Sequence, residues 1–501
     1  MLLLVANLLA QAMLILPHGL RASWLRLPAG LAMVSAFVQV ALEGQRWQMV
    51  PAYGLTLVIF VVSMARARSV GVAGAVAGRG WRAFIAIGLG VAAFVMAAAL
   101  PVIAPVFSFP ATTGAYAIGT LTYHWIDATR SEAFAADPRA RRELMVQIWY
   151  PAQSPASGLR SAYMPDAGAV TAAFARILHL PQFVFGHFRY VTTHATPSLP
   201  AASHPPSFPV LLFLEGATGF RQMNTYQIED LVSHGYIVVA IDQPGAAAAV
   251  VFPDGHQIEG LDLAQFQATV RPSYMPDLPG LPRDITPIPP GLTRQRGSFI
   301  AYLAKDVAFT LDQLADLNRA DPNGILTGKL NLQHVGAFGI SLGGIVVGEA
   351  CLVEPRLRAC LVMDAAMSTD VVRAGLNRPS MWITRDAATM RLERERAGGW
   401  PEAEIEAHQT SMRAAFEGLS GAGYFVRVPG MFHSNFTDVS IWTPISSLLG
   451  FAGPINPQRA HAIVNAYTLA FFDCHVSGHK VELLDGPSTQ YPEADFEARV
   501  P

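Results

Sequence analysis

The sequence predicts an α/β domain, with a mainly parallel sheet flanked by helices, that follows an N-terminal bundle of membrane-spanning helices. Hydrophobic residues make up 51% of the 501 residues and charged residues only 14%, whereas globular proteins carry about 25% charged residues. The apolar excess is concentrated in residues 1–107. After residue 107, short β-rich runs alternate with helical patterns, as in a parallel sheet covered by helices.

The N-terminal region contains four apolar runs, at residues 1–16, 27–42, 49–65 and 83–107. A helix needs about 20 apolar residues to cross a bilayer, within a range of about 17–25. The fourth run meets this length, the third just meets it, and the first two need their flanks. The first run could instead be a signal peptide, although it lacks a basic segment and a small-residue cleavage site. We expect four membrane helices in residues 1–107.

Arginines in the connections between the runs predict the orientation of these helices. The first and third connections contain Arg21, Arg26, Arg66, Arg68, Arg79 and Arg82. The second connection contains only Arg46. Because cytoplasmic loops are enriched in basic residues, we expect both chain ends, and the whole domain after residue 107, to lie outside the cytoplasm, in the periplasm or at the cell exterior.

Residues 108–501 are predicted to form one α/β domain. Its strands are predicted at residues 144–150, 208–214, 236–242, 334–339, 359–364, 380–384 and 423–428. Several of these runs are almost continuously apolar, as expected for strands that are buried on both faces. Helices are predicted at residues 298–318, where apolar residues recur at helical spacing, and at residues 457–473.

Residues 244–296 are rich in proline and break the alternation of strands and helices. A connection of this length without regular structure is uncommon in a compact domain and is usually a lid, a binding loop or a disordered segment. It follows the C-terminal end of a strand, which is the edge where ligands bind in open α/β sheets. We therefore expect a lid or insert here.

The segment GISLGG at residues 339–344 matches the pattern G-x-S-x-G and centres on Ser341. The pattern alone is weak because Gly and Ser are common. Here a predicted strand precedes it and an apolar helical run follows, which is the strand–turn–helix of a nucleophile elbow. Gly339 and Gly343 leave room for the strained turn. Ser341 is therefore the candidate nucleophile, and an ordinary Gly-rich turn is the alternative.

A serine nucleophile needs a base and an acid that orients the base. Hydrolases with such an elbow order their triad Ser, acid, His along the chain. Among 14 histidines, His433 directly follows the last predicted strand and is the candidate base. The acid stays open between Asp364, at the end of the strand after the nucleophile helix, and Asp386, after the next strand.

The domain resembles the lipoprotein-associated, form II platelet-activating-factor acetylhydrolases over roughly residues 110–485. The matching stretches are VQIWYP at 146–151, FLEGATGFR at 213–221, DLVSHGYIVVA at 230–240, GISLGG at 339–344, LVMDAAM at 361–367 and HSNFTD at 433–438. The resemblance implies an α/β-hydrolase fold, with Asp364 as the acid and Asp386 as the alternative. It also implies an oxyanion hole made by the backbone amides of Ala217 and Leu342. This chain has Glu215 and Gly216 where the family usually has His-Gly.

By this resemblance we expect a serine ester hydrolase that cleaves acyl esters, with lipid or short-acyl phospholipid esters as substrates. The family does not supply the four N-terminal helices, and these apolar runs are the reason to expect that the enzyme is membrane-tethered. The family needs no metal, and the sequence gives no reason to expect a metal or another cofactor. The apolar stretch 174–190, with Phe183 and Phe185, is then an interfacial flap or the lining of an acyl pocket. A buried helix and loop is the alternative for this stretch.

Two other functions stay open from the sequence. The enzyme could act on small soluble esters, lactones or amides, because a fold does not determine a substrate. The chain could also be a non-catalytic membrane sensor or binding module, although the complete set of candidate triad residues argues against this. A net charge of −2 gives no reason to expect nucleic acid as a partner. The three cysteines exclude a disulfide scaffold, and the oligomeric state cannot be inferred.

Overall fold

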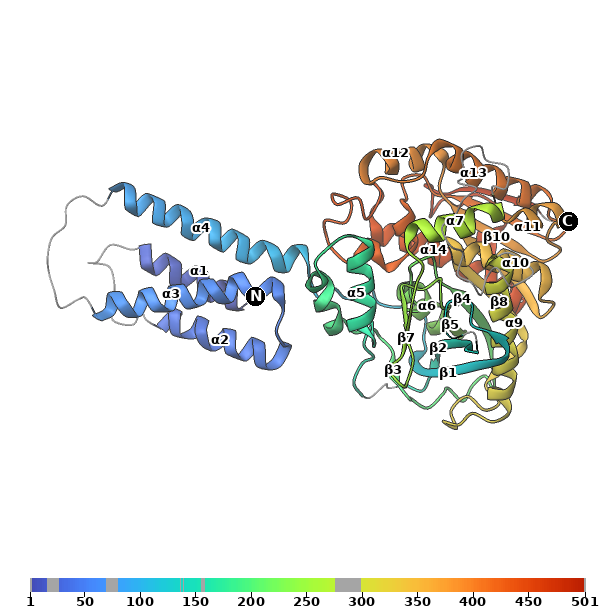
Figure 1. Ribbon diagram of the computed structural model, residues 1–501, viewed down its shortest axis with the longest axis horizontal. Helices are drawn as coiled ribbons and strands as arrows, with labels where there is room; N and C mark the ends of the chain where they lie inside the picture. The colour runs from blue at the N-terminus through green and yellow to red at the C-terminus, as the bar shows by residue number, and fades with distance from the viewer. Residues whose placement is uncertain are drawn as a thin grey trace. The chain divides into compact units, whose positions relative to one another are not determined.

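The chain forms two compact units in a computed structural model (Figure 1). The structure describes residues 2–15, 27–68, 80–135, 137, 139–154, 158–274 and 299–499. The first, which we call the helical unit, comprises residues 1–107 together with the short segments Phe183–Tyr190 and Trp442–Ile445. The second, which we call the α/β unit, comprises the rest of the chain.

The helices of the helical unit cover the four predicted apolar runs. They are α1 (Leu2–Ile15), α2 (Leu27–Glu43), η3 (Trp47–Met49), α3 (Val50–Arg68) and α4 (Gly80–Ile103). Among the described residues one helix, Trp47–Ala65, is long and apolar enough to cross a membrane. The apolar helices Leu2–Leu14, Leu27–Glu43 and Ile87–Ile103 are shorter. Of the four predicted spanning helices, therefore, one has the length and composition of a membrane span among the described residues.

The interior of the helical unit combines alanines and polar side chains with a few larger apolar residues, among them Leu55 and Ile59. Ala52 is fully buried, and the buried Asn7 donates a hydrogen bond to Thr56 Oγ1 over 2.9 Å. Other large apolar side chains are exposed, among them Phe37 at 70% and Phe84 at 78%. In a water-soluble helix bundle, by contrast, most large apolar residues face inward.

A ten-stranded sheet forms the centre of the α/β unit. Its strands are β1 (Ala117–Ser131), β2 (Arg141–Ala152), β3 (Thr196–Pro197), β4 (Phe208–Leu214), β5 (Ile237–Asp242), β8 (Leu330–Ile340), β9 (Leu357–Met363), β10 (Ser380–Thr384), β11 (Gly423–Arg427) and β12 (Asp495–Arg499). They lie in the order β12-β11-β10-β9-β8-β4-β5-β2-β1-β3. The strands from β5 to β11 in this order are parallel, whereas β2 and β12 are antiparallel to their neighbours. The predicted α/β fold with a mainly parallel sheet is confirmed.

Helices cover both faces of the sheet. They are α5 (Ala167–Ile177), α6 (Thr225–Ser233), α9 (Phe299–Arg319), α10 (Leu342–Val353), α11 (Thr369–Ala374), α12 (Ala387–Ala397), α13 (Glu402–Glu417) and α14 (Pro457–Phe472). Alternate residues of β4 face opposite layers because strand side chains have a period of two. Val210 and Leu212 belong to the core that includes α9 and α10. Phe213 contacts Phe338 of β8, which in turn contacts Phe472 of α14.

Part of the proline-rich segment 244–296 has regular structure that the sequence did not predict. The short strands β6 (Ala249–Val251) and β7 (Gln257–Glu259) pair with each other, and α7 (Leu263–Tyr274) follows them. The later part of the predicted lid or insert, from residue 275 onward, lies outside the described residues.

Candidate active site

Ser341 lies in the sharp turn between β8 and α10. Its φ of 54° and ψ of −123° belong to a region that residues other than glycine rarely adopt. The turn is possible because glycines stand two residues before and two residues after Ser341. A Cβ added at Gly343 would lie 2.1 Å from the Leu214 carbonyl oxygen, and one at Gly339 would lie 2.5 Å from the Gly343 backbone. The geometry is that of a nucleophile elbow at the C-terminal edge of the sheet.

Asp364 and His433 lie together at the same edge. Asp364 follows β9, the neighbour of β8, and His433 begins the 3-10 helix η6 (His433–Phe436) after β11. His433 Nδ1 lies 2.5 Å from Asp364 Oδ2. The Asp364 side chain is fully buried, whereas that of His433 is 29% exposed. The imidazole therefore has one nitrogen on a buried carboxylate, and part of its ring is open to solvent.

The Asp364 carboxylate has further polar neighbours. Arg385, directly after β10, approaches Oδ2 through Nε at 3.0 Å, and Thr384 Oγ1 donates to Oδ1 over 3.1 Å. His408 Nε2 lies 3.5 Å from Oδ1 without hydrogen-bond geometry. Burial raises the pKa of Asp364, but Arg385, His408 and His433 outweigh burial and hold the pKa well below the usual range. Because Asp364 is ionised, His433 donates its Nδ1 proton to it and keeps Nε2 as an acceptor.

Ser341 and Asp364 lie at the ends of adjacent strands. The Ser341 N–H donates a hydrogen bond to the carbonyl of Met363, the residue before Asp364, over 3.0 Å. Among the described residues, however, no hydrogen bond joins Ser341 Oγ to His433 Nε2. Catalytic hydrogen bonds are often long in the absence of substrate and tighten only in the complex. The structure thus pairs the acid with the histidine and leaves the serine without a hydrogen bond to the pair.

Asp386, the alternative acid, caps a helix. Its carboxylate accepts a hydrogen bond from the Thr389 N–H over 2.8 Å at the N-terminus of α12. The same helix carries Glu393, whose Oε1 accepts the backbone N–H of His433 over 3.1 Å. Asp386 therefore stabilises the helix that anchors the His433 loop, and its carboxylate makes no hydrogen bond to the imidazole within the described chain.

The backbone amides of Ala217 and Leu342 are free of hydrogen bonds among the described residues. Leu342 is the first residue of α10, where helix N–H groups lack partners and the helix dipole is positive. The loop with Ala217 passes close to Ser341, because a Cβ on Gly216 would lie 3.2 Å from Ser341 Cβ. Two such donors beside a serine can stabilise the negative charge of a tetrahedral intermediate.

Glu215 is buried in the α/β unit. The acetylhydrolases that the sequence resembles usually have histidine at this position. Glu215 Oε1 accepts the Gln243 N–H over 3.0 Å, and its Oε2 has no hydrogen-bond partner among the described residues. Burial and the neighbouring Asp242 raise the pKa of Glu215 well above its usual range. The raised pKa favours the protonated, uncharged form of this side chain next to the oxyanion loop.

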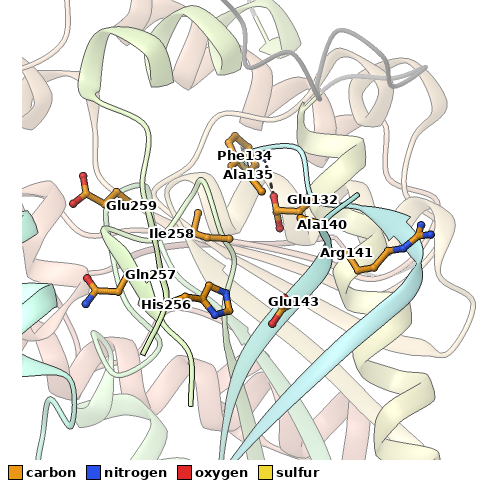
Figure 2. Close-up of a pocket in the computed structure, with 10 residues that line it drawn as sticks. All are labelled: Glu132, Phe134, Ala135, Ala140, Arg141, Glu143, His256, Gln257, Ile258 and Glu259. Atoms are coloured by element: carbon orange, nitrogen blue, oxygen red, sulfur yellow. Dashed lines mark hydrogen bonds between the residues drawn. The ribbon is translucent and has the colours of Figure 1, made fainter. Parts of the chain in front are cut away.

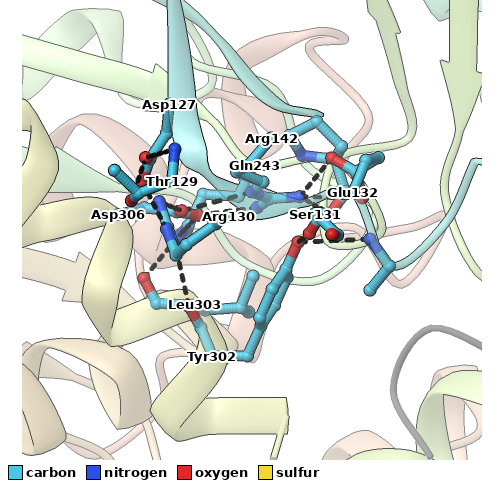
Figure 3. Close-up of polar contacts among 12 residues, drawn as sticks. Asp127, Thr129, Arg130, Ser131, Glu132, Arg142, Gln243, Tyr302, Leu303 and Asp306 are labelled. Carbon is cyan, nitrogen blue, oxygen red and sulfur yellow. Dashed lines mark hydrogen bonds and ion pairs between the residues drawn. The ribbon is translucent and has the colours of Figure 1, made fainter. Parts of the chain in front are cut away.

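A buried network of charges holds the strand end behind this loop (Figure 3). Gln243 Nε2 donates to Asp306 Oδ2 over 2.8 Å, and Arg142 pairs with Asp306 at 2.6 Å and with Glu132 at 3.0 Å. Burial raises the pKa of Asp306, but Arg142 and Arg130 outweigh it and hold the pKa below the usual range. Because its charges are paired, the network links β1, β2 and α9 rigidly to the end of β5.

The predicted interfacial residues Phe183 and Phe185 belong to the helical unit, within the 3-10 helix η5 (Gln182–Tyr190). Phe183 is 56% exposed and packs edge-on against Trp47 at 5.3 Å. Phe185 is buried and contacts Phe188 at 5.5 Å and Trp442 at 6.1 Å. Phe183 is thus a half-exposed surface residue, and Phe185 is part of an aromatic core.

A cavity of about 400 Å³ lies elsewhere on the α/β unit (Figure 2). Three of its lining residues are acidic: Glu132, Glu143 and Glu259. Each pairs with a basic side chain, namely Arg142, His124 and Arg176 respectively. No candidate triad residue lines this cavity. In the part of the chain that the structure describes, no group of three or more His, Cys, Asp or Glu side chains is placed to hold a metal ion.

Sequence reasoning missed Arg385, Glu393 and Asp438. Arg385 follows the C-terminal end of β10, directly before Asp386, and this position at a strand end could have marked it as a candidate site residue. Glu393 and Asp438 gave no local signal, because their partners are distant in sequence. Asp438, the last residue of HSNFTD, accepts the backbone N–H groups of Thr225 and Tyr226 at the start of α6.

Three comparisons relate the chain to known proteins. The family model for platelet-activating factor acetylhydrolase, isoform II, matches residues 103–260. A probable 1-alkyl-2-acetylglycerophosphocholine esterase from Arthroderma benhamiae is 23% identical over 305 residues, which cover 58% of this chain. The match spans 66% of that relative, just under two thirds of its length.

The solved structure of a ferulic acid esterase from Streptomyces cinnamoneus is similar to this chain with a TM-score of 0.58 and 26% identity. The alignment covers 78% of this chain and 99% of that structure. The fold is therefore that of an α/β-hydrolase esterase. Together the three comparisons support an esterase that resembles the isoform II acetylhydrolases.

Proposed function

We propose that this chain is a membrane-tethered serine ester hydrolase in which Ser341, His433 and Asp364 form the catalytic triad. The observation that carries the proposal is the hydrogen bond between His433 Nδ1 and a buried, ionised Asp364 at the edge where the Ser341 elbow lies. This bond fixes the tautomer that a general base needs, because it leaves Nε2 unprotonated. The three comparisons with esterases support the reaction class.

In the proposed reaction, Ser341 Oγ attacks the ester carbonyl while His433 Nε2 takes the serine proton. The amides of Ala217 and Leu342 hold the negative oxygen of the tetrahedral intermediate. The alcohol leaves with the proton from His433 and the acyl group stays on Ser341. Water, deprotonated by His433, then releases the acid and restores the serine. The raised pKa of Glu215 favours this chemistry, since an ionised carboxylate there would repel the oxyanion.

Labelling with a fluorophosphonate probe and turnover of a short acyl ester test the nucleophile. Ser341→Ala is expected to lose labelling and about 10⁴–10⁶-fold of turnover. Ser154→Ala, at an exposed serine of the α/β unit, is the matched control and should behave as wild type. Activity retained by Ser341→Ala, in protein that folds as wild type does, would refute the triad.

We propose lipid or phospholipid-like short-acyl esters as the substrate class. The support is the isoform II acetylhydrolase model and the glycerophosphocholine esterase relative. A tether also favours such substrates, because a lipid ester that stays in the bilayer avoids exposing its chain to water, at about 0.8 kcal/mol per CH₂. A panel of acyl esters that vary in chain length, with and without a phosphocholine headgroup, tests this class.

A small soluble ester is the second candidate, and one observation favours it. The solved structure that aligns over 99% of its own length is a ferulic acid esterase. Feruloyl esters therefore belong in the same panel. Faster turnover of feruloyl esters than of headgroup-bearing acyl esters at equal concentration would favour this second candidate.

The helical unit supports the membrane tether. Its buried alanines and its interior Asn7–Thr56 hydrogen bond are typical of membrane bundles, where small and polar residues mediate helix contacts. Its exposed Phe37 and Phe84 suit a lipid surrounding. We propose that all four helices lie in the bilayer, although Trp47–Ala65 is the one that meets the length for a span among the described residues. Retention in the membrane fraction after carbonate washing tests this.

We propose that the α/β unit lies outside the cytoplasm. The arginine distribution supports this orientation, although Arg21, Arg26 and Arg79 lie outside the described residues. A disulfide between Cys351 of α10 and Cys360 of β9 is a second, independent support. Disulfides persist in oxidising compartments and are rare in the cytosol.

A membrane-impermeant maleimide added to intact cells tests the orientation. Asp254→Cys, at a side chain that is 70% exposed, should be labelled in a background with Cys474 replaced by Ser. Ala75→Cys, in the third connection, should be labelled only after the membrane is permeabilised. The opposite pattern would invert the topology.

A further inference from the structure

A second charge cluster, in which Arg385 is fully buried and Glu393 is 15% exposed, contacts the acid of the candidate triad. Arg385 has no exposed side-chain surface and lies between two carboxylates. Its Nε contacts Asp364 at 3.0 Å, and its Nη1 donates to Glu393 Oε2. Its Nη2 has no hydrogen-bond partner among the described residues. Because a buried guanidinium is costly to desolvate, its place beside the acid calls for a role.

Glu393 connects this cluster to the histidine a second time. Its Oε2 accepts from Arg385, and its Oε1 accepts the backbone N–H of His433 over 3.1 Å. Arg385 and Glu393 thus form a bridge from the acid to the backbone of the base, parallel to the direct Asp364–His433 hydrogen bond. The bridge determines where both triad members lie.

Aromatic and neutral groups enclose the cluster. Trp400 contacts the His433 ring edge-on at 5.1 Å, stacks on His408 at 5.3 Å and lies under the Arg385 guanidinium at 4.9 Å. From α13, His408 faces Asp364, and Gln409 Nε2 donates to the Arg385 carbonyl over 3.0 Å. Thr384 completes the surroundings from β10. Burial lowers the pKa of His408 despite the neighbouring Asp364, so His408 is neutral at neutral pH. Among the described residues, the charged side chains joined to His433 or to its partner Asp364 are therefore Asp364, Glu393 and Arg385.

These three groups sum to one negative charge, which matches the single proton that His433 takes up during turnover. We propose that Arg385 is a positioning residue that holds the Asp364 carboxylate in place and, balanced by Glu393, sets the charge against which His433 is protonated. The inference rests on the proposed Ser–His–Asp function and deepens it. Without Arg385, the Asp364 and Glu393 carboxylates would lose the cation that lies between them, and His433 would face both negative charges.

Two substitutions should move the pH profile in opposite directions. Arg385→Met leaves a net charge of −2 beside His433. The acidic limb of the pH profile of kcat/KM should therefore shift to higher pH by about one unit. We also expect kcat to fall about tenfold with little change in KM, since substrate binding is untouched. Glu393→Gln leaves a net charge of zero and keeps an acceptor for the His433 N–H. The acidic limb of the pH profile should therefore shift to lower pH.

The controls separate charge from structure. Arg385→Lys keeps the charge and should return the limb to near its wild-type position. Arg394→Met removes an arginine from the same helix, α12, that pairs with Glu402 at 3.0 Å and does not touch Asp364, so its profile should be that of wild type.

The inference is overturned if the Arg385→Met and Glu393→Gln limbs both stay in place or move in the same direction. If Arg385→Met does not fold, the pH profile of Glu393→Gln decides by itself. A shift of its acidic limb to lower pH supports the inference, and an unshifted limb overturns it. Ser341→Ala, measured alongside, keeps this outcome separate from the proposed function. Loss of activity there with unmoved limbs overturns only the role of Arg385, whereas retained activity overturns the triad itself.

Discussion

Asp364 Oδ2 and His433 Nδ1 lie 2.5 Å apart although 69 residues separate them along the chain. They meet because β9 and β11 are parallel and flank the same strand, β10, so that their C-terminal ends lie at one edge of the sheet. The acid is buried and the histidine part-exposed, which suits an acid that orients and a base that exchanges protons with substrate and water.

Substitution of the two candidate acids should give unequal losses. Asp364→Asn is expected to lower turnover about 10⁴-fold, because an amide favours the wrong histidine tautomer. Asp386→Asn should keep most of the activity, since asparagine caps a helix as well as aspartate does. Steady-state rates on one short acyl ester check both. The reverse ranking would move the acid to Asp386.

The elbow should not tolerate a methyl group at Gly343. A Cβ there would lie 2.1 Å from the Leu214 carbonyl oxygen, so Gly343→Ala must displace the turn that holds Ser341 and should abolish most fluorophosphonate labelling. Gly168→Ala, in α5 with nothing within 4 Å of the added atom, should stabilise the fold by up to about 1 kcal/mol. Wild-type labelling of Gly343→Ala would contradict the close packing.

Glu215 should make the fold less stable as the pH rises. Its folded-state pKa is raised well above about 4.5 by burial and by Asp242. Above pH 4.5 the unfolded state loses this proton and the folded state keeps it, so the free energy of unfolding falls with rising pH. Glu215→Gln removes this loss. The difference in melting temperature, variant minus wild type, should therefore grow from about pH 4.5 upward, and a constant difference would show that Glu215 is ionised in the fold.

Phe183 should matter for esters in a membrane and not for esters in solution. It is 56% exposed and belongs to the helical unit. Phe183→Ser is expected to slow hydrolysis of acyl esters embedded in phosphatidylcholine vesicles and to leave a short soluble ester unaffected. Leu159→Ser, at an 89% exposed leucine of the α/β unit, is the matched control. Equal effects of Phe183→Ser on both substrates would remove Phe183 from substrate access.

Phe185 should respond differently from Phe183 because it is buried against Phe188 and Trp442. Phe185→Ser is expected to destabilise the protein by about 3–5 kcal/mol, as truncation of a buried aromatic residue does. Thermal unfolding in detergent measures this. An unchanged melting temperature would place Phe185 outside the core and restore it as an interfacial residue.

The central strands, the four N-terminal helices and the Ser341 elbow could all be predicted from the sequence. Their signals are local: continuous apolar runs for strands buried on both faces, long apolar runs for the helices, and closely spaced glycines for the turn. The sequence did not predict β1 or the hairpin of β6 and β7. These lie at or beyond the antiparallel side of the sheet, where exposed positions interrupt the apolar pattern.

What the sequence determined by itself is therefore the central strands, the order of strands and helices along the chain, and the serine turn, since each depends on neighbours within a few residues. Spacing left Asp364 and Asp386 both open as partners of His433, because both end strands, and the family resemblance favoured Asp364. The tertiary structure places Asp364 against His433 and Asp386 at the start of α12. It also decided that Arg385 and Glu393 bridge acid and base, and that Phe183 and Phe185 join the helical unit. A local sequence pattern predicts strands, helices and turns. A contact between distant segments depends instead on the order of the strands in the whole sheet.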